Sequence, residues 1–325
     1  MPDMAMIADH PGGPEVMQWL ATETPAPKSG EVVLRQTAIG VNFLDVYNRS
    51  GLYPWSGTTM IPGAEAVGVV EMVGPDVTGL SPGQRVAYVT MLGAYRQRRV
   101  MPADRLVRVP DGITDTQVAG ALLKGLTAQY LVTGSYPAKA GDTVLVHAAA
   151  GGVGLLLGQR LKSLGVTAIG TAGTPEKMAL AKAHGYAHVI NSRTEDFAAI
   201  TRDITGGAGV AAVYDSVGQD TWQGSLKSLA KRGMFVSFGQ SSGMIQGFSL
   251  ADLARNGSLS ANRPVLFDYI VTQEDLANRA NDLFSRIIDG SLTVNTPMTL
   301  PLHRAADAHR ALEARETTGA TVLLP

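Results

Sequence analysis

A glycine-rich turn between an apolar run and a helical segment constrains this chain more than any other feature. Residues 144–154 read VLVHAAAGGVG, so a strand passes into a helix through residues almost without side chains. Small residues at 148, 151 and 154 let the backbone turn sharply, let a pyrophosphate approach the main chain, and let the helix pack close to the strand. The free N–H groups of the helix then face the anion. We therefore predict a phosphate-binding turn formed by Ala150, Gly151, Gly152 and Val153.

The segments after this turn distinguish it from an ordinary tight turn, because β-branched runs alternate there with helical stretches. This alternation predicts a doubly wound parallel sheet, which binds dinucleotides at the turn after its first strand. Strands are expected at 143–147, 167–171, 189–191, 210–215, 234–238 and 258–261, and helices at 153–164, 175–184, 194–205, 220–229 and 250–256.

The two ends of the chain have a different pattern. Strand-like runs at 31–39, 66–73 and 85–89 are separated by Pro and Gly turns, with one short helix at 43–50, which predicts a mostly antiparallel β domain. The last segment contains only two helices, 274–289 and 302–315, and a strand, 321–324, too little to form a domain alone. We therefore predict an α/β protein of two domains. Residues 1–123 and 266–325 form the catalytic domain, residues 124–265 form an inserted nucleotide-binding domain, and the cleft between them is the active site.

Composition excludes several classes of function. The net charge is −1, so the chain has no electrostatic footprint for nucleic acid or an anionic membrane. No apolar run approaches the roughly 18 to 20 residues that span a bilayer, and no signal peptide is recognisable, so we expect a cytoplasmic protein. The chain has no cysteine, which excludes disulfides, thiolate metal sites and cysteine nucleophiles. No nucleophile elbow surrounds Ser216, so a serine hydrolase is not expected.

The end of the second expected strand indicates which dinucleotide binds. A domain that prefers NAD places an acid about 20 residues after the glycine turn, whereas here no acid ends the strand. Lys177 can instead reach a 2′-phosphate, assisted by the N–H groups of Gly173 and Thr174, and this favours NADPH. The alternative is that Lys177 is a solvated helix lysine and Thr174 a helix cap. Arg193 is either a second charge beside that phosphate or a lone exposed arginine.

Seven short motifs, in this order, carry a resemblance to a known family. They are HPGGPEV at 10–16, GVNFLD at 40–45, RSGLYP at 49–54, KGLTA at 124–128, VHAAAGGVG at 146–154, YDSVG at 214–218 and FGQSSG at 238–243. The whole chain resembles the zinc-independent, ζ-crystallin-like quinone oxidoreductases of the medium-chain dehydrogenase/reductase superfamily. The resemblance implies a GroES-like domain around an inserted Rossmann domain, NADPH as donor, a quinone as acceptor, and a homodimer.

The resemblance also favours certain side chains at the acceptor. The hydroxyls of Tyr47 and Tyr53 and the amide of Asn42 can stabilise charge on a quinone oxygen. Each has a structural alternative, as a packing residue of the short helix, a turn aromatic and a helix cap respectively. Asn42 stands where the superfamily's zinc enzymes carry a cysteine ligand, and Glu65 lacks a histidine neighbour, so no metal is expected.

Further coenzyme contacts come from loops and from a helix that Lys124 and Thr127 are expected to begin. In the bacterial quinone reductases a tyrosine covers the ribose phosphate after the third strand, but here Ser192 follows, which can bond the phosphate without covering it. Arg263 is either a coenzyme contact or an ion-pair partner at the hinge. The remaining expected contacts are Lys124, Thr127, Ser192, Ser216, Phe238, Gly239, Gln240, Ser241 and Arg263.

Three functions are compatible with these residues. The first is NADPH-dependent quinone reduction without a metal, by direct transfer from the dihydronicotinamide. The second is NADPH-dependent reduction of an activated C=C bond in an enal or enone, with the tyrosines stabilising the enolate. The third is a non-catalytic NADPH-binding structural protein. A dimer could form through the last strand of the nucleotide-binding domain, whose edge is unpaired.

Overall fold

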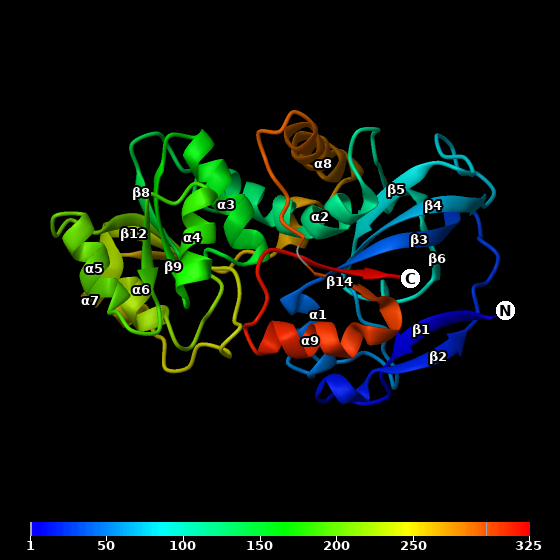
Figure 1. The fold of residues 1–325 in the computed structure, drawn as a ribbon, viewed down its shortest axis with the longest axis horizontal. Helices are drawn as coiled ribbons and strands as arrows, with labels where there is room; N and C mark the ends of the chain where they lie inside the picture. The colour runs from blue at the N-terminus through cyan, green and yellow to red at the C-terminus, as the bar shows by residue number, and fades with distance from the viewer. Residues whose placement is uncertain (1, 297) are drawn as a thin grey trace. The chain divides into compact units, whose positions relative to one another are not determined.

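The chain divides into two compact units, each built around its own sheet. The computed structural model describes residues 2–296 and 298–325. Unit 1 comprises Met1–Lys124 and Ile270–Pro325, and unit 2 comprises Gly125–Tyr269. Figure 1 shows that unit 1 contains both ends of the chain, with the blue N-terminal strands and the red C-terminal segment in the same unit.

Unit 1 is built on antiparallel strands, as the sequence predicts. Its main sheet has the order β14-β15-β3-β4-β5-β7, with β6 also paired to β3. Only the β14–β15 pair in this sheet is parallel among the described residues. A separate hairpin pairs β1 with β2. The bounds are β1 Asp3–Ile7, β2 Gln18–Thr22, β3 Glu31–Val41, β4 Glu65–Val73, β5 Arg85–Val89, β6 Arg98–Pro102, β7 Val107–Arg108, β14 Met298–Pro301 and β15 Thr321–Leu324.

The C-terminal segment belongs to the main sheet of unit 1 and contributes to its hydrophobic core. β15 pairs with β3 in antiparallel register, and Leu323 packs in the same buried cluster as Val32, Leu34 and Tyr88. Burying such a set of apolar side chains is the main favourable term in holding the two ends of the chain together. The GroES-like, mostly antiparallel fold is confirmed.

The helices of unit 1 differ from the predicted ranges mainly where they begin. Helix α2 begins at Asp115, well before Lys124, so Lys124 and Thr127 lie inside the helix rather than at its start. The predicted helix 302–315 is a 3₁₀ turn, Leu302–Arg304, followed by the shorter helix α9; such tighter turns are frequent at the starts of α-helices. The bounds are α1 Phe43–Arg49, α2 Asp115–Tyr130, α8 Gln273–Ile288 and α9 Ala305–Glu313, and α2 continues from unit 1 into unit 2 after Lys124.

Unit 2 contains a six-stranded parallel sheet with the order β10-β9-β8-β11-β12-β13. In chain order within the unit this is 3-2-1-4-5-6, the order of a doubly wound dinucleotide-binding sheet. The order reverses between β8 and β11, so the carboxyl ends of these two strands form the switch point where dinucleotides bind. The bounds are β8 Thr143–Val146, β9 Thr167–Ala172, β10 His188–Asn191, β11 Val210–Asp215, β12 Leu229–Ser237 and β13 Ser260–Asn262.

The helices and strands of unit 2 follow the predicted alternation, and their boundaries differ most from the predicted ones at α5 and β12. Helix α5 begins at Phe197 rather than 194, because the Asp196 carboxylate accepts the first helical N–H groups. Strand β12 begins at Leu229, five residues before the predicted start. No described helix is long and apolar enough to cross a membrane. The bounds are α3 Gly152–Ser163, α4 Pro175–Ala183, α5 Phe197–Ile204, α6 Trp222–Ser228 and α7 Leu250–Arg255.

Candidate functional site

The glycine-rich turn joins β8 to α3 with the geometry of an anion site. Ala148 adopts a left-handed backbone, with φ 53°, and Gly151 is the N-cap of α3 without a side-chain cap. A Cβ at Gly154 would lie 2.4 Å from the carbonyl oxygen of Ala148, so only glycine allows the helix to pass this close to the turn. The N–H groups of Gly152 and Val153 lie in the first turn of α3, where the helix provides no acceptor, and are therefore available to an oxyanion.

A buried cluster of polar side chains begins at His147, directly before this turn. His147 bonds through Nδ1 to Thr171 Oγ at 3.1 Å and through Nε2 to Ser225 Oγ at 3.0 Å. Ser225 in turn donates to the Asp215 carboxylate at 2.8 Å. Burial lowers the pKa of His147 below its usual value. The cluster links the ends of β8, β9 and β11, and our sequence reasoning missed it, although a histidine directly before the small residues was its signal.

The residues predicted to meet a 2′-phosphate gather at the carboxyl ends of β9 and β10. Thr174 is the N-cap of α4, with Oγ accepting from Lys177 N–H at 3.3 Å. The Ser192 N–H donates to the Ala172 carbonyl at 3.0 Å and so holds the next loop against β9. A Cβ at Gly173 would lie 3.1 Å from Arg193 Nε, so the guanidinium lies over this glycine.

Charge at this end of the sheet favours a phosphate. No Asp or Glu ends β9, whose last residue is Ala172. The nearby carboxylate of Glu195 accepts from the Asn191 N–H at 2.6 Å, so it is bonded to the backbone of its own loop. Cationic side chains beside main-chain N–H groups bind phosphate by charge-assisted hydrogen bonds. The donor set of unit 2 therefore fits a dinucleotide with a 2′-phosphate.

The loop after β12 packs on the loop after β11. The Phe238 N–H donates to the Asp215 carbonyl at 2.8 Å and the Ser241 N–H to the Ser216 carbonyl at 3.1 Å. A Cβ at Gly239 would lie 2.7 Å from the Ser216 carbonyl oxygen. Arg263 donates to the Ser237 carbonyl at 2.8 Å.

In unit 1, a buried carboxylate joins two of the predicted site residues. Glu65 is fully buried, and its Oε1 accepts from Asn42 Nδ2 and from Lys124 Nζ, both at 2.9 Å. Its Oε2 accepts from the Leu123 N–H at 2.7 Å. The described residues contain no group of three or more His, Cys, Asp or Glu side chains placed to hold a metal ion. The cation that neutralises Glu65 is thus the ammonium of Lys124, which the resemblance placed near the nicotinamide. This bond uses one of the three N–H donors of the ammonium.

Sequence reasoning missed a second buried network of hydrogen-bonded side chains, which begins beside Asn42. The Asp45 carboxylate accepts from the Asn42 N–H at 2.8 Å and from the Tyr95 hydroxyl at 3.0 Å. The Tyr95 oxygen also lies 3.0 Å from His309 Nε2. Burial raises the pKa of Asp45 to about 7 and lowers the pKa of His309 to about 3. The capping-box spacing of Asn42 and Asp45 was the one local signal for this hydrogen-bond network.

The two tyrosines that are predicted to contact the quinone lie next to each other. The rings of Tyr47 and Tyr53 meet edge to face with centroids 5.6 Å apart, and the Tyr53 N–H donates to the Tyr47 carbonyl at 3.1 Å. Tyr47 is buried on α1 and also contacts Phe43. Tyr53 is half-buried, and its hydroxyl has no hydrogen-bond partner among the described residues. The Asn42 amide nitrogen donates to Glu65 and, at 3.5 Å, to the Gly40 carbonyl. Among the three side chains predicted to contact the quinone, the Tyr53 hydroxyl is therefore the donor that remains available.

Comparison with known proteins adds evidence independent of this geometry. A model described as "Alcohol dehydrogenase GroES-like domain" matches residues 28–111, and one described as "Zinc-binding dehydrogenase" matches residues 152–284. The chain is 46% identical over 315 residues to the quinone oxidoreductase of Pseudomonas aeruginosa, covering 97% of each chain. It is 43% identical over 329 residues to a 2-haloacrylate reductase of a Burkholderia species, covering 99% of each. The crystal structure of Escherichia coli quinone oxidoreductase complexed with NADPH matches with a TM-score of 0.97 at 43% identity, covering 99% of this chain and 100% of that one.

Proposed function

Because this chain belongs to the zinc-independent quinone oxidoreductase family of the medium-chain dehydrogenase/reductase superfamily, we propose that it reduces quinones directly with NADPH. It is an oxidoreductase, and its coenzyme is NADPH. The observation that carries the mechanism is the pairing of Glu65 with the Lys124 ammonium and the Asn42 amide. These groups bond to one another rather than offering a set of metal ligands, so the chemistry suits an acceptor that needs no Lewis acid. A quinone is electron-poor enough to meet that condition.

Unit 2 supplies the groups that hold the coenzyme. The first turn of α3 binds the pyrophosphate through main-chain N–H groups, and Gly154 permits the close approach. Lys177 and Arg193 neutralise the 2′-phosphate, and the Ser192 hydroxyl bonds it. When bound, NADPH supplies a hydride equivalent from its dihydronicotinamide ring.

Unit 1 supplies the groups that meet the acceptor. The Tyr53 hydroxyl donates a hydrogen bond to the quinone oxygen on which negative charge develops. The ring of Tyr47 packs edge to face against Tyr53 and fixes its orientation. Asn42 acts as a positioning residue, since it begins α1, which carries Tyr47, and bonds to buried Glu65.

The test compares acceptors on one preparation of the protein. We expect NADPH oxidation to be faster with 1,4-naphthoquinone than with 2-chloroacrylate or an alkenal. Tyr53→Phe should lower kcat with the quinone by about tenfold, corresponding to one lost hydrogen bond to developing charge. Tyr136→Phe is the matched control, because its hydroxyl bonds to Asp142 at 3.1 Å. A quinone rate unchanged in Tyr53→Phe contradicts the assigned role.

Reduction of an activated C=C bond is the second candidate. The Burkholderia relative is named a 2-haloacrylate reductase, and the chain matches it almost as well as it matches the quinone oxidoreductases. The same tyrosine hydroxyl can stabilise an enolate oxygen. A faster rate with the alkenal or 2-chloroacrylate than with the naphthoquinone establishes this function in place of the first.

We also propose a homodimer and a cytoplasmic location. Strand β13 is an edge strand of the parallel sheet, and an unpaired strand edge is suited to pairing with a second copy. Light scattering coupled to size exclusion gives the mass of the particle in solution, and a monomer contradicts the dimer.

A further inference from the structure

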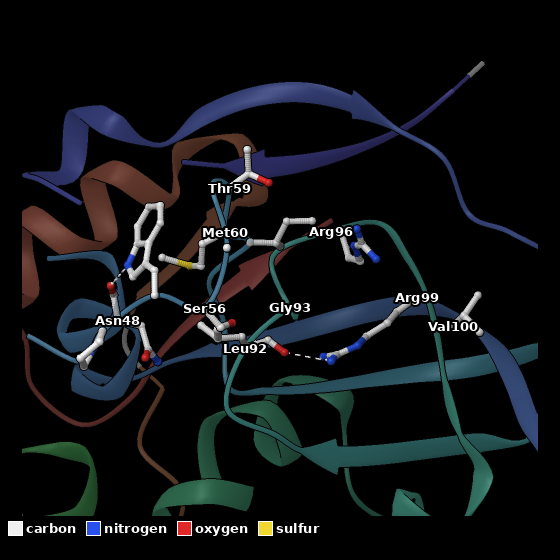
Figure 2. Close-up of a pocket in the computed structure, with 13 residues that line it drawn as sticks. Asn48, Ser56, Thr59, Met60, Leu92, Gly93, Arg96, Arg99 and Val100 are labelled. Carbon is white, nitrogen blue, oxygen red and sulfur yellow. Dashed lines mark hydrogen bonds between the residues drawn. The ribbon is translucent and has the colours of Figure 1, made fainter. Parts of the chain in front are cut away.

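Unit 1 holds a pocket that the proposed reaction does not use (Figure 2). Its volume is about 420 Å³. Two segments far apart in sequence form most of it: the loop after α1, which includes Pro54, Trp55 and Ile61, and the segment that leads into β6. Its lining residues do not include Asn42, Tyr47 or Tyr53, the three side chains predicted to contact the quinone.

Two arginines, Arg96 and Arg99, line one side of this pocket. Arg99 donates from Nη2 to the Leu92 carbonyl at 2.8 Å, drawn as a dashed line in Figure 2, and its guanidinium carbon lies 4.9 Å from the centre of the Tyr88 ring. Arg96 makes one long hydrogen bond, from Nη2 to Thr22 Oγ at 3.5 Å. Each guanidinium has five N–H donors, so most donors of both are without a protein acceptor.

The neighbouring Arg98 shows how an arginine in this segment is normally neutralised. Arg98 bonds to the carboxylates of Asp3 and Glu71, both at 2.6 Å. Arg96 and Arg99 form no ion pair with any described residue, and no Asp or Glu lines the pocket in the part of the chain that the structure describes. The sequence thus places three arginines within four positions, and two of them form no ion pair with a described carboxylate.

This arrangement is unfavourable in the protein alone. Arg96 Nε and Arg99 Nη1 are buried and have no hydrogen-bond partner. Burial lowers the pKa of Arg96, and the positive charge of Arg99 lowers it further, whereas Tyr88 and Asp3 act in the opposite direction. Two partly buried arginines that form no ion pair destabilise a fold, and an anion in the pocket would offset their repulsion.

The rest of the lining indicates what kind of anion fits. Trp55, Met60 and Ile61 present apolar surface, and the Trp55 indole is held by a bond from Nε1 to the Asn48 carbonyl at 2.6 Å. A volume of about 420 Å³ lies in the range of small-molecule pockets and far exceeds one inorganic oxyanion. We propose that this pocket binds a small organic anion, with its carboxylate or phosphate at Arg96 and Arg99 and its apolar body against Trp55.

The test uses the full-length protein saturated with NADPH, so that the coenzyme's phosphate sites are occupied. Benzoate and phenyl phosphate are the probes, titrated calorimetrically, and neutral benzamide and inorganic phosphate are the comparisons. We expect either organic anion to bind at least about tenfold more tightly than benzamide and inorganic phosphate. Whether benzoate or phenyl phosphate binds more tightly identifies the head group, and either order supports the site.

Variants locate the binding. Arg96→Gln and Arg99→Gln should each weaken binding of the tighter probe by at least about tenfold, whereas Lys182→Gln, at an exposed position, should leave it within about twofold. Without a probe, Arg96→Gln should unfold at the same temperature as the parent protein or a higher one, because it relieves repulsion, and its NADPH affinity reports that the fold is intact.

Three results overturn the proposal. The first is that neither organic anion binds saturably. The second is that benzamide or inorganic phosphate binds as tightly as the organic anions. The third is that Arg96→Gln and Arg99→Gln bind the probe like the parent protein. None of these results depends on which acceptor the enzyme reduces, so the proposed function is tested separately.

Discussion

The coenzyme groups of unit 2 and the polar cluster of unit 1 are assembled in different ways. In unit 2, the anion site is a turn of consecutive residues, and its donors are main-chain N–H groups that the helix leaves unused. In unit 1, Glu65 bonds to Asn42, which is 23 residues away, and to Lys124, which is 59 residues away. One site depends on backbone conformation, and the other depends on which distant side chains meet in the core.

This difference predicts different responses to substitution. A main-chain site is disturbed by adding a side chain where the backbone needs space, and changes of side-chain polarity matter less. A buried charge cluster is disturbed by removing one partner, because the other charge is then left unpaired in a medium of low polarity. The following four experiments test this comparison.

The largest effect is expected in the glycine turn. Gly154→Val places atoms where even a Cβ lies 2.4 Å from the Ala148 carbonyl oxygen, so backbone must move. We expect a loss of more than about 3 kcal/mol in stability and no measurable NADPH binding, because the displaced helix no longer presents its N–H groups. Calorimetric titration and thermal unfolding measure the two effects.

Gly151→Ala separates binding from folding at the same turn. Its Cβ meets only the Ala148 oxygen, at 3.2 Å, and the backbone has a negative φ of −79°. NADPH should bind more weakly while the unfolding temperature changes little. Equal damage from the two variants contradicts the view that Gly154 provides space for packing and Gly151 provides space for the ligand.

The second experiment removes the cation from the unit 1 cluster. Lys124→Met leaves the fully buried Glu65 carboxylate without its charge partner, and should cost about 3–5 kcal/mol. The double variant Lys124→Met/Glu65→Gln should be more stable than Lys124→Met alone, because the unpaired charge is gone. Urea unfolding checks both, with exposed Lys139→Met as the control. A double variant no more stable than the single one contradicts the charge explanation.

The third experiment follows pH. Asp45 has a folded pKa of about 7, above its usual 3.8, so the folded protein alone holds this proton between those values and stability falls as pH rises. His309 has a folded pKa of about 3, below its usual 6.5, so the unfolded chain alone takes up a proton between those values and stability falls as pH falls. The two opposite slopes cancel between about pH 4 and pH 6.5.

A variant that lacks one of these two groups reveals the pH dependence of stability that the other group causes. His309→Gln leaves the Asp45 slope, so stability relative to the parent protein should fall with rising pH by up to about 1.4 kcal/mol per unit. Asp45→Asn leaves the His309 slope, of similar size and opposite sign. Urea unfolding from pH 4.5 to pH 6.5 measures both, and exposed His303→Gln should follow the parent protein. Parallel profiles in all four proteins contradict the assigned pKa shifts.

The smallest effect is expected from the cation beside the 2′-phosphate. Lys177→Gln should raise the KM for NADPH by about tenfold, about 1.4 kcal/mol, and leave the KM for NADH unchanged. Lys182→Gln, on the exposed last turn of the same helix, is the control. A similar change with both coenzymes means that Lys177 supports the helix rather than the phosphate.

Much of the fold could be predicted because it depends on local pattern. Residues 210–215 and 321–324 are strands over the predicted range, and the six-stranded parallel sheet has the predicted connections, because alternation of β-branched and helical stretches is a property of neighbouring residues. The glycine turn belongs to the same class, since its conformation depends on the absence of side chains there. Predicted boundaries were wrong where a side-chain cap decided them, as at Asp196 before α5.

The sequence by itself therefore determined the two kinds of sheet, the anion-binding turn, and NADPH as the coenzyme. Only the tertiary structure decided that Lys124 neutralises Glu65, that Tyr95 connects Asp45 with His309, and that Arg96 and Arg99 share a pocket without a carboxylate. The physical reason is that chain pattern specifies which face of an element is buried, whereas partners in the core are chosen by how elements pack together. Tyr95 and His309 are 214 positions apart, and only the closed fold brings their side chains within hydrogen-bond distance.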